Sequence, residues 1–171
     1  MFAPSWLFLA HTDQFKKSGD FFSTYVGEDP VIVVGKDRKI RAFLNSCQHR
    51  GARVGTTRNF TCTHHGWSYD LAGGLISVPN EAGYPPHFDR SDWGLVEVAQ
   101  IDSYHGLIFG TWNPQAPPLK EALGEMVWYM DAMLDHDEQG TEVVSGVHNG
   151  SSKATGNWPP SSSPPTGTTS T

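Results

Sequence analysis

The chain has 171 residues, a formal net charge of −6 at pH 7 and two cysteines. This negative charge gives no electrostatic reason to expect nucleic acid or an anionic membrane surface as a partner. No apolar run approaches the roughly 20 residues of a membrane-spanning helix, and the N-terminus lacks the features of a signal peptide. Two cysteines do not make a disulfide scaffold, so a reducing cytoplasm is the expected compartment.

The first segment and the region that follows it differ in pattern. Residues 2–17 join an apolar cluster to a charged end and predict an N-terminal helix, or a helix that leads into a strand. From residue 20 to about 112, short strand-forming segments alternate with turn residues. The expected strands are 21–27, 30–35, 39–45, 59–62, 67–70 and 75–78, with a turn at Gly73-Gly74 and a closing hairpin over 94–112 that turns at His105-Gly106. Closely spaced short strands predict a small antiparallel sandwich or barrel.

The spacing of apolar residues changes towards the C-terminus. Over 118–135 they recur three or four positions apart, which predicts an amphipathic helix. We expect its methionines, Met126, Met130 and Met133, to pack in the core. Residues 159–171 contain no charge and no apolar side chain other than proline. Such a segment cannot bury enough surface to offset its ordering entropy, so we expect a disordered tail.

Two short motifs carry the candidate metal ligands. Residues 47–51 read CQHRG and residues 62–67 read CTHHGW, so each motif offers a thiolate and an imidazole. In the first, the Cys and the His are two apart and point to the same side of an extended loop, whereas the step of three in the second needs a tight turn. Two Cys and two His could also bind structural zinc, but zinc modules favour Cys–Cys and His–His pairs. One Cys and one His in each motif favour an iron–sulfur cluster with both thiolates on one iron and both imidazoles on the other.

The paired motif, C-x-H-R-G and C-x-x-H-G-W, resembles the Rieske motif of the large (α) subunits of aromatic ring-hydroxylating dioxygenases. Residues 5–11, 19–34, 43–45, 75–81 and 119–135 are also similar to that family, so the resemblance covers roughly residues 1–148. The helix over 119–135 is most similar to enzymes that attack biphenyl-like and polycyclic aromatics.

The resemblance implies a mainly β fold, a Rieske-type antiparallel β-sandwich with an N-terminal helical segment, one C-terminal amphipathic helix and then a disordered tail. It implies an N-terminal segment (1–19), a Rieske domain (20–116), a helix with the start of the connection to a catalytic domain (117–148) and a low-complexity tail (149–171). Two loop tips would hold a [2Fe–2S] cluster through Cys47, His49, Cys62 and His65. Trp67 would pack around the sulfurs and tune the cluster.

The chain departs from the family pattern at two places near these ligands. Residues 50–61 are shorter than the segment that usually separates the two motifs. His64 stands where the family usually has Tyr, and it adjoins His65, so it is an alternative ligand. The Gly-Trp pair that follows His65 favours His65 as the ligand.

A third departure concerns catalysis. The family activates O2 at a second, mononuclear Fe(II) held by two His and one carboxylate. This chain has no Asp or Glu after Glu142 and no His after His148. We therefore expect the catalytic domain and its iron site to be missing from this chain, and we assign no catalytic residue.

The function implied by the resemblance is the electron-transfer portion of such an α subunit. Electrons from NADH would pass through a reductase, a ferredoxin or both to the cluster, and then to the mononuclear iron of a neighbouring α subunit. That iron cis-dihydroxylates an aromatic hydrocarbon, in assemblies that contain other α subunits and commonly a β subunit. A stand-alone Rieske ferredoxin is the second hypothesis, although such carriers lack segments like 5–11 and 119–135. A zinc-binding or interaction module is the third.

Overall fold

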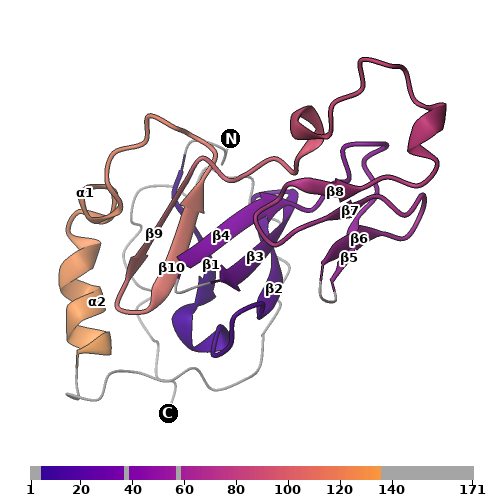
Figure 1. The fold of residues 1–171 in the computed structure, drawn as a ribbon. Helices are drawn as coiled ribbons and strands as arrows, with labels where there is room; N and C mark the ends of the chain where they lie inside the picture. The colour runs from indigo at the N-terminus through magenta and orange to yellow at the C-terminus, as the bar shows by residue number, and fades with distance from the viewer. Residues whose placement is uncertain (1–4, 37–38, 57–58, 136–171) are drawn as a thin grey trace, which may run out of the picture.

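The computed structural model describes residues 5–36, 39–56 and 59–135, which form three antiparallel sheets and a few short helices (Figure 1). The strands are β1 (Leu7–His11), β2 (Phe21–Val26), β3 (Asp29–Lys36), β4 (Lys39–Leu44), β5 (Val54–Thr56), β6 (Phe60–Cys62), β7 (Ser68–Tyr69), β8 (Leu75–Ser77), β9 (Gln100–Tyr104) and β10 (Leu107–Thr111). The helical elements are η1 (Thr12–Gln14), η2 (Glu81–Gly83), η3 (Arg90–Trp93), α1 (Leu119–Leu123) and α2 (Met126–Leu134). The strand orders are β1-β10-β9, β2-β3-β4 and β5-β6-β7-β8. The prediction of a mainly antiparallel β fold is confirmed.

The sheet β2-β3-β4 lies between the other two sheets (Figure 1). Its central strand, β3, has an unbroken apolar run, Val31 to Val34, and all four side chains are 0 % exposed. Val31 and Val33 face a core shared with β1 and β10, whereas Ile32 and Val34 face a core shared with the sheet β5–β8. A strand that is covered on both faces is apolar throughout, because neither face meets water. The arrangement is therefore a sandwich with a buried middle sheet.

The N-terminal segment differs from the expected helix. Residues Leu7–His11 form strand β1, which pairs antiparallel with β10, and only Thr12–Gln14 form a helical turn. An apolar run this short fits a helix and a strand equally well, so periodicity cannot decide between them. The strand conformation is favoured because residues 7–11 can pair with the free edge of β10, and this pairing buries Leu9 and Ala10.

The expected single helix over 118–135 is two helices, which are separated at Gly124, where φ is +51°. The expectation that its methionines pack in the core is wrong for Met126 and Met133, which are 54 % and 71 % exposed. The spacing of apolar residues predicted helical structure correctly. It could not show whether another segment covers the face with Met126 and Met133, and no described segment does. None of the described helices is long and apolar enough to cross a membrane. The expected tail, with the rest of residues 136–171, lies outside the described residues.

The hairpin between β7 and β8 turns at Gly73, as predicted. Gly73 has φ +86°, and a Cβ atom placed on it would lie 2.5 Å from Cε1 of Phe43. The Phe43 ring is buried at 1 % exposure, so it has little room to move away.

We expect Gly73→Ala to lower the free energy of unfolding by about 2–4 kcal/mol, because it combines a left-handed backbone with an overpacked core. Urea unfolding followed by circular dichroism measures the change. Gly83→Ala is the matched control, since no atom lies within 4 Å of its added Cβ. Its effect should stay within about 0.5 kcal/mol. Equal stability of the two variants would contradict the packing argument.

Candidate metal centre

The two motifs fold into loops with the same backbone frame. In each loop the cysteine N–H donates to the carbonyl five residues on, and the cysteine carbonyl accepts from the glycine four residues on. The N···O distances are 2.8 Å for Cys47–Ala52, 2.7 Å for Gly51–Cys47, 2.8 Å for Cys62–Trp67 and 2.9 Å for Gly66–Cys62. Both glycines have φ +73°, which closes the tight turn that the sequence predicted for the second motif.

The shortened segment between the motifs still forms a hairpin. Strand β5 pairs with β6 in a register that sets Val54 opposite Cys62 and Thr56 opposite Phe60. The buried side chain of Asn45 accepts a hydrogen bond from the Val54 N–H at 2.9 Å, which ties the start of the first loop to β5. The pairing therefore brings the two loops to the same end of the sheet.

The structure gathers the four predicted ligands around this end. Cys47 and Cys62 are free thiols, 2 % and 1 % exposed, and they belong to one buried cluster with Trp67. The rings of His49 and His65 meet edge to face, with centroids 4.6 Å apart. Each loop thus contributes one buried thiol and one imidazole, as the motifs predicted.

The alternative ligand His64 is placed differently. Its side chain is exposed, and its ring centroid lies 6.1 Å from that of His65. The imidazole of the second loop that meets His49 is that of His65. The geometry therefore favours His65 as the partner of His49.

The residues present fit a metal cluster. Nδ1 of His49 is buried and has no hydrogen-bond partner among the described residues, which is unusual for a polar atom unless it binds a ligand. Burial, together with the nearby His65 and Arg50, lowers the pKa of His49 below its ordinary value. The imidazole is therefore neutral at pH 7, the state in which histidine binds metal.

Convergence of the ligands on one ion is not observed. Among residues 5–36, 39–56 and 59–135, no three His, Cys, Asp or Glu side chains are grouped as ligands of a single metal ion. A structural zinc site needs four ligands within about 2.0–2.3 Å of one point. A two-iron cluster needs only two protein ligands on each iron.

The sequence analysis missed Tyr69, a fully buried residue of β7. Its hydroxyl lies 3.2 Å from Sγ of Cys47 and accepts a hydrogen bond from the Gln48 N–H at 3.1 Å. Burial and the adjacent thiol raise the pKa of Tyr69 well above its ordinary value, so the phenol keeps its proton. In the expected strand 67–70, its position two residues after Trp67 would have placed both side chains on one face, and this was the available signal.

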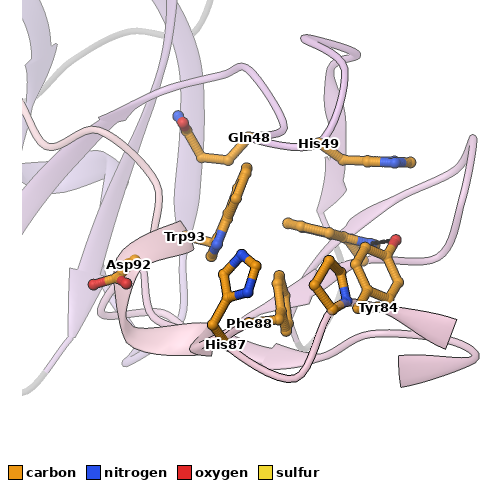
Figure 2. A pocket seen from close by; sticks show the side chains of 9 residues that line it. Gln48, His49, Tyr84, His87, Phe88, Asp92 and Trp93 are labelled. Carbon is orange, nitrogen blue, oxygen red and sulfur yellow. Dashed lines mark hydrogen bonds between the residues drawn. The ribbon is translucent and has the colours of Figure 1, made fainter. Parts of the chain in front are cut away.

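Trp67 packs beside the imidazole side of the site. Its ring is 1 % exposed and stacks on the ring of His49, with centroids 4.9 Å apart and planes 13° apart. A cavity of about 550 Å³ opens between the first loop and the segment after β8 (Figure 2). Its lining residues are Gln48, His49, Trp67, Tyr84, Pro85, His87, Phe88, Asp92 and Trp93.

Comparison with known proteins places this geometry in a family. The model of the Rieske [2Fe-2S] domain matches residues 5–101. The α subunit of biphenyl 2,3-dioxygenase from Rhodococcus jostii is 47 % identical over 153 residues, which cover 86 % of this chain and 33 % of the relative. The α subunit of benzene 1,2-dioxygenase from Pseudomonas putida is 48 % identical, with 86 % and 34 % covered.

Solved structures agree with these relatives. A naphthalene 1,2-dioxygenase with indole bound in its active site superposes with a TM-score of 0.74 at 40 % identity, over 80 % of this chain and 32 % of that one. The chain spans about a third of the length of the curated relatives it matches. Those relatives are dioxygenase α subunits, which gives no support to a stand-alone carrier. Because the family model matches more than half of its length, this chain belongs to the Rieske [2Fe-2S] domain family.

Proposed function

We propose that this chain is the electron-transfer portion of an aromatic ring-hydroxylating dioxygenase α subunit. The observation that carries the proposal is the pair of loops with one backbone frame, each offering a buried thiol and an imidazole at the same end of the sheet. Cys47 and Cys62 would hold one iron of a [2Fe–2S] cluster, and His49 and His65 would hold the other. When bound, the cluster supplies reversible one-electron chemistry at a potential of about −150 to +300 mV.

The protein's own residues divide into two sides. Buried Cys47, Cys62 and Tyr69 surround the thiolate side and exclude water from it. His65 is exposed, so electrons would enter and leave on the imidazole side. Arg50 is exposed on the first loop, close enough to His49 to act on its charge, and there it would attract an acidic donor protein.

The wider role follows from the relatives. We infer that the donor is a ferredoxin, an NADH-dependent reductase or both, and that the acceptor is a mononuclear Fe(II) in a catalytic domain on a neighbouring α subunit. The substrate class would be aromatic hydrocarbons, because the relatives are named for biphenyl, benzene and naphthalene. We propose α subunits with β subunits in the cytoplasm as the full assembly. We also propose the division into segments 1–19, 20–116, 117–148 and 149–171.

Anaerobic reconstitution with iron and sulfide tests the proposal. The protein should turn red-brown and give a reduced-state EPR signal with an average g value below that of an all-Cys [2Fe–2S] cluster, because two ligands are imidazoles. Reduction by NADH through a dioxygenase reductase and ferredoxin should produce the same signal. Stoichiometric zinc with no iron after reconstitution would reject the proposal.

Tyr69→Phe should lower the reduction potential of the cluster by about 40–80 mV. When Cys47 binds iron as a thiolate it has no proton to donate, so the Tyr69 hydroxyl, 3.2 Å from Sγ, would donate a hydrogen bond that stabilises the more negative, reduced cluster. Losing about 1–2 kcal/mol of this preference corresponds to that shift for one electron. Potentiometric titration followed by EPR measures it. Tyr129→Phe, which alters an exposed tyrosine on α2, is the control and should not shift the potential. An unchanged potential in Tyr69→Phe would show that the hydroxyl does not tune the cluster.

A further inference from the structure

The segment that follows β8, residues 79–93, is called the arm here. It contains η2 and η3 but no strand, and it extends beyond the sheet β5–β8 at one end of the molecule (Figure 1). Among the described residues, the backbone–backbone hydrogen bonds made by residues 80–93 all close within the arm. The backbone therefore does not fix the arm to the sheet. Side chains must hold it in place.

Aromatic side chains of the arm cover Trp67. The rings of Tyr84, Phe88 and Trp93 lie 6.0, 5.9 and 5.7 Å from the Trp67 ring, measured between centroids. The Trp67 indole also donates a hydrogen bond to the Tyr84 hydroxyl at 3.2 Å. Figure 2 shows Tyr84, Phe88 and Trp93 below the first loop, which carries His49. The arm therefore packs on Trp67, whose ring is 1 % exposed.

Trp67 in turn supports His49. The two rings are stacked nearly parallel, so the indole fixes the plane in which the imidazole lies. A chain of contacts thus runs from the arm through Trp67 to His49. Any movement of the arm away from the sheet would admit water to the indole and free the imidazole to turn.

One guanidinium fastens the arm. Arg90 of η3 donates through Nε, at 2.7 Å, and through Nη2 to the two carboxylate oxygens of Glu81, which begins η2. Its Nη1 donates at 2.7 Å to the carbonyl of Ile76 on β8. Arg90 therefore joins both helical turns of the arm to each other and to the sheet. The planar guanidinium of Arg90 uses three of its N–H donors here. It suits this role because it fixes the orientation of the groups that it binds as well as supplying a positive charge.

We propose that the arm is a fastened cover over Trp67 and the adjacent His49, which leaves His65 exposed, and that Glu81 and Arg90 are positioning residues that hold Trp67 against His49 and so set the reduction potential. The inference rests on the proposed cluster ligands. Reduction adds one negative charge to the cluster, and water stabilises that charge better than aromatic rings do. Loosening the cover should therefore raise the potential and expose the arm.

Arg90→Gln tests the proposal in the holoprotein, with Arg41→Gln as the matched control. Arg41 makes the same kind of fork, to Glu97 at 2.8 and 3.0 Å, and also donates to a backbone carbonyl, that of Ala72 at 3.3 Å. The two ion pairs are similarly exposed, at 41 % and 40 % for Arg90–Glu81 and 37 % and 43 % for Arg41–Glu97. The control removes an equivalent interaction that does not touch the arm.

Hydrogen–deuterium exchange of the peptide that spans the arm should be about threefold to tenfold faster in Arg90→Gln than in Arg41→Gln. At a fixed applied potential, the ratio of reduced to oxidised cluster should rise by up to about tenfold, which is about 59 mV for one electron. If Arg90→Gln yields no holoprotein, Glu81→Gln against Glu97→Gln makes the same comparison and leaves the bond to Ile76 in place.

The exchange rate of the arm and the reduction potential of the cluster test separate steps of this inference. Equal exchange in the two variants would show that Arg90 does not fasten the arm. Faster exchange with an unchanged potential would show that the arm does not set the properties of the cluster, and either result overturns the inference. Wild-type protein that binds no cluster would instead overturn the proposed function, so the two failures are distinguishable.

Discussion

Replacement of His65 by alanine is expected to abolish the iron–sulfur cluster. The ring of His65 meets that of His49 at a centroid distance of 4.6 Å, and the Nδ1 atom of His49 is buried without a hydrogen-bond partner among residues 5–36, 39–56 and 59–135. Removing one of two imidazoles leaves an iron with an open position at an exposed edge, where water and oxygen can attack it. Bound iron per chain, visible absorption and the reduced-state EPR signal after anaerobic reconstitution should all fall to background.

His64→Ala is the control for this experiment. Its side chain is exposed, and the change removes an imidazole from the same loop without touching His49. The cluster should form with an unaltered spectrum. Bleaching by His64→Ala together with a normal spectrum for His65→Ala would mean that the second ligand lies two residues after Cys62, as it does after Cys47 in the first loop.

The second expectation is that this chain alone forms no cis-dihydrodiol from naphthalene or biphenyl, even with NADH, reductase and ferredoxin supplied. O2 activation by the family needs an iron with open positions, held by two His and one carboxylate. The described residues contain no group that could hold a single metal ion, and the sequence has no Asp or Glu after Glu142 and no His after His148. Electrons would reach the cluster and stop there.

Chromatographic detection of the diol, with reduction of the cluster followed in the same sample, makes the test sharp. A reduced cluster without product shows that electron delivery works and oxygen chemistry does not. Product above a control without the protein would mean that the chain carries an iron site that neither the motifs nor the described structure indicates.

The strands that could be predicted are those whose own pattern decides their structure. The unbroken run Val31 to Val34 is apolar enough to require burial on both faces, and β3 is found there. Gly73 and the pair His105-Gly106 supply the left-handed backbone of two hairpin turns, at φ +86°, +45° and +82°. In each case a few neighbouring residues determine the outcome.

The elements that could not be predicted depend on distant partners. Leu7–His11 is a strand because β10 offers an open edge, and nothing near residue 7 signals that edge. Met126 was expected to be buried because apolar residues recur there at helical spacing. That pattern does not show whether another segment covers the helix, and Met126 is 54 % exposed.

The ligand motifs were predictable because a cluster demands particular residue types at short spacing. Among the side chains that support the ligands, only Trp67 was expected, and that expectation came from the family resemblance. Tyr69 reaches Cys47 across 22 positions of sequence, and Tyr84 reaches Trp67 across 17. Contacts that span the chain in this way have no local signal, so only the packing shows them.

The exposed face of α2 is expected to affect how the isolated chain behaves in concentrated solution. Trp128 and Tyr129, at 68 % and 56 % exposure, form an apolar surface together with the exposed methionines. Surfaces of this kind meet in solution to escape water, so sedimentation velocity should show reversible self-association that grows with concentration. In Figure 1, α2 and the sheet β5–β8 lie at opposite ends of the molecule. Self-association through α2 would therefore leave the two cluster loops uncovered. We expect the EPR spectrum to stay constant over the range of protein concentrations in which the sedimentation coefficient changes.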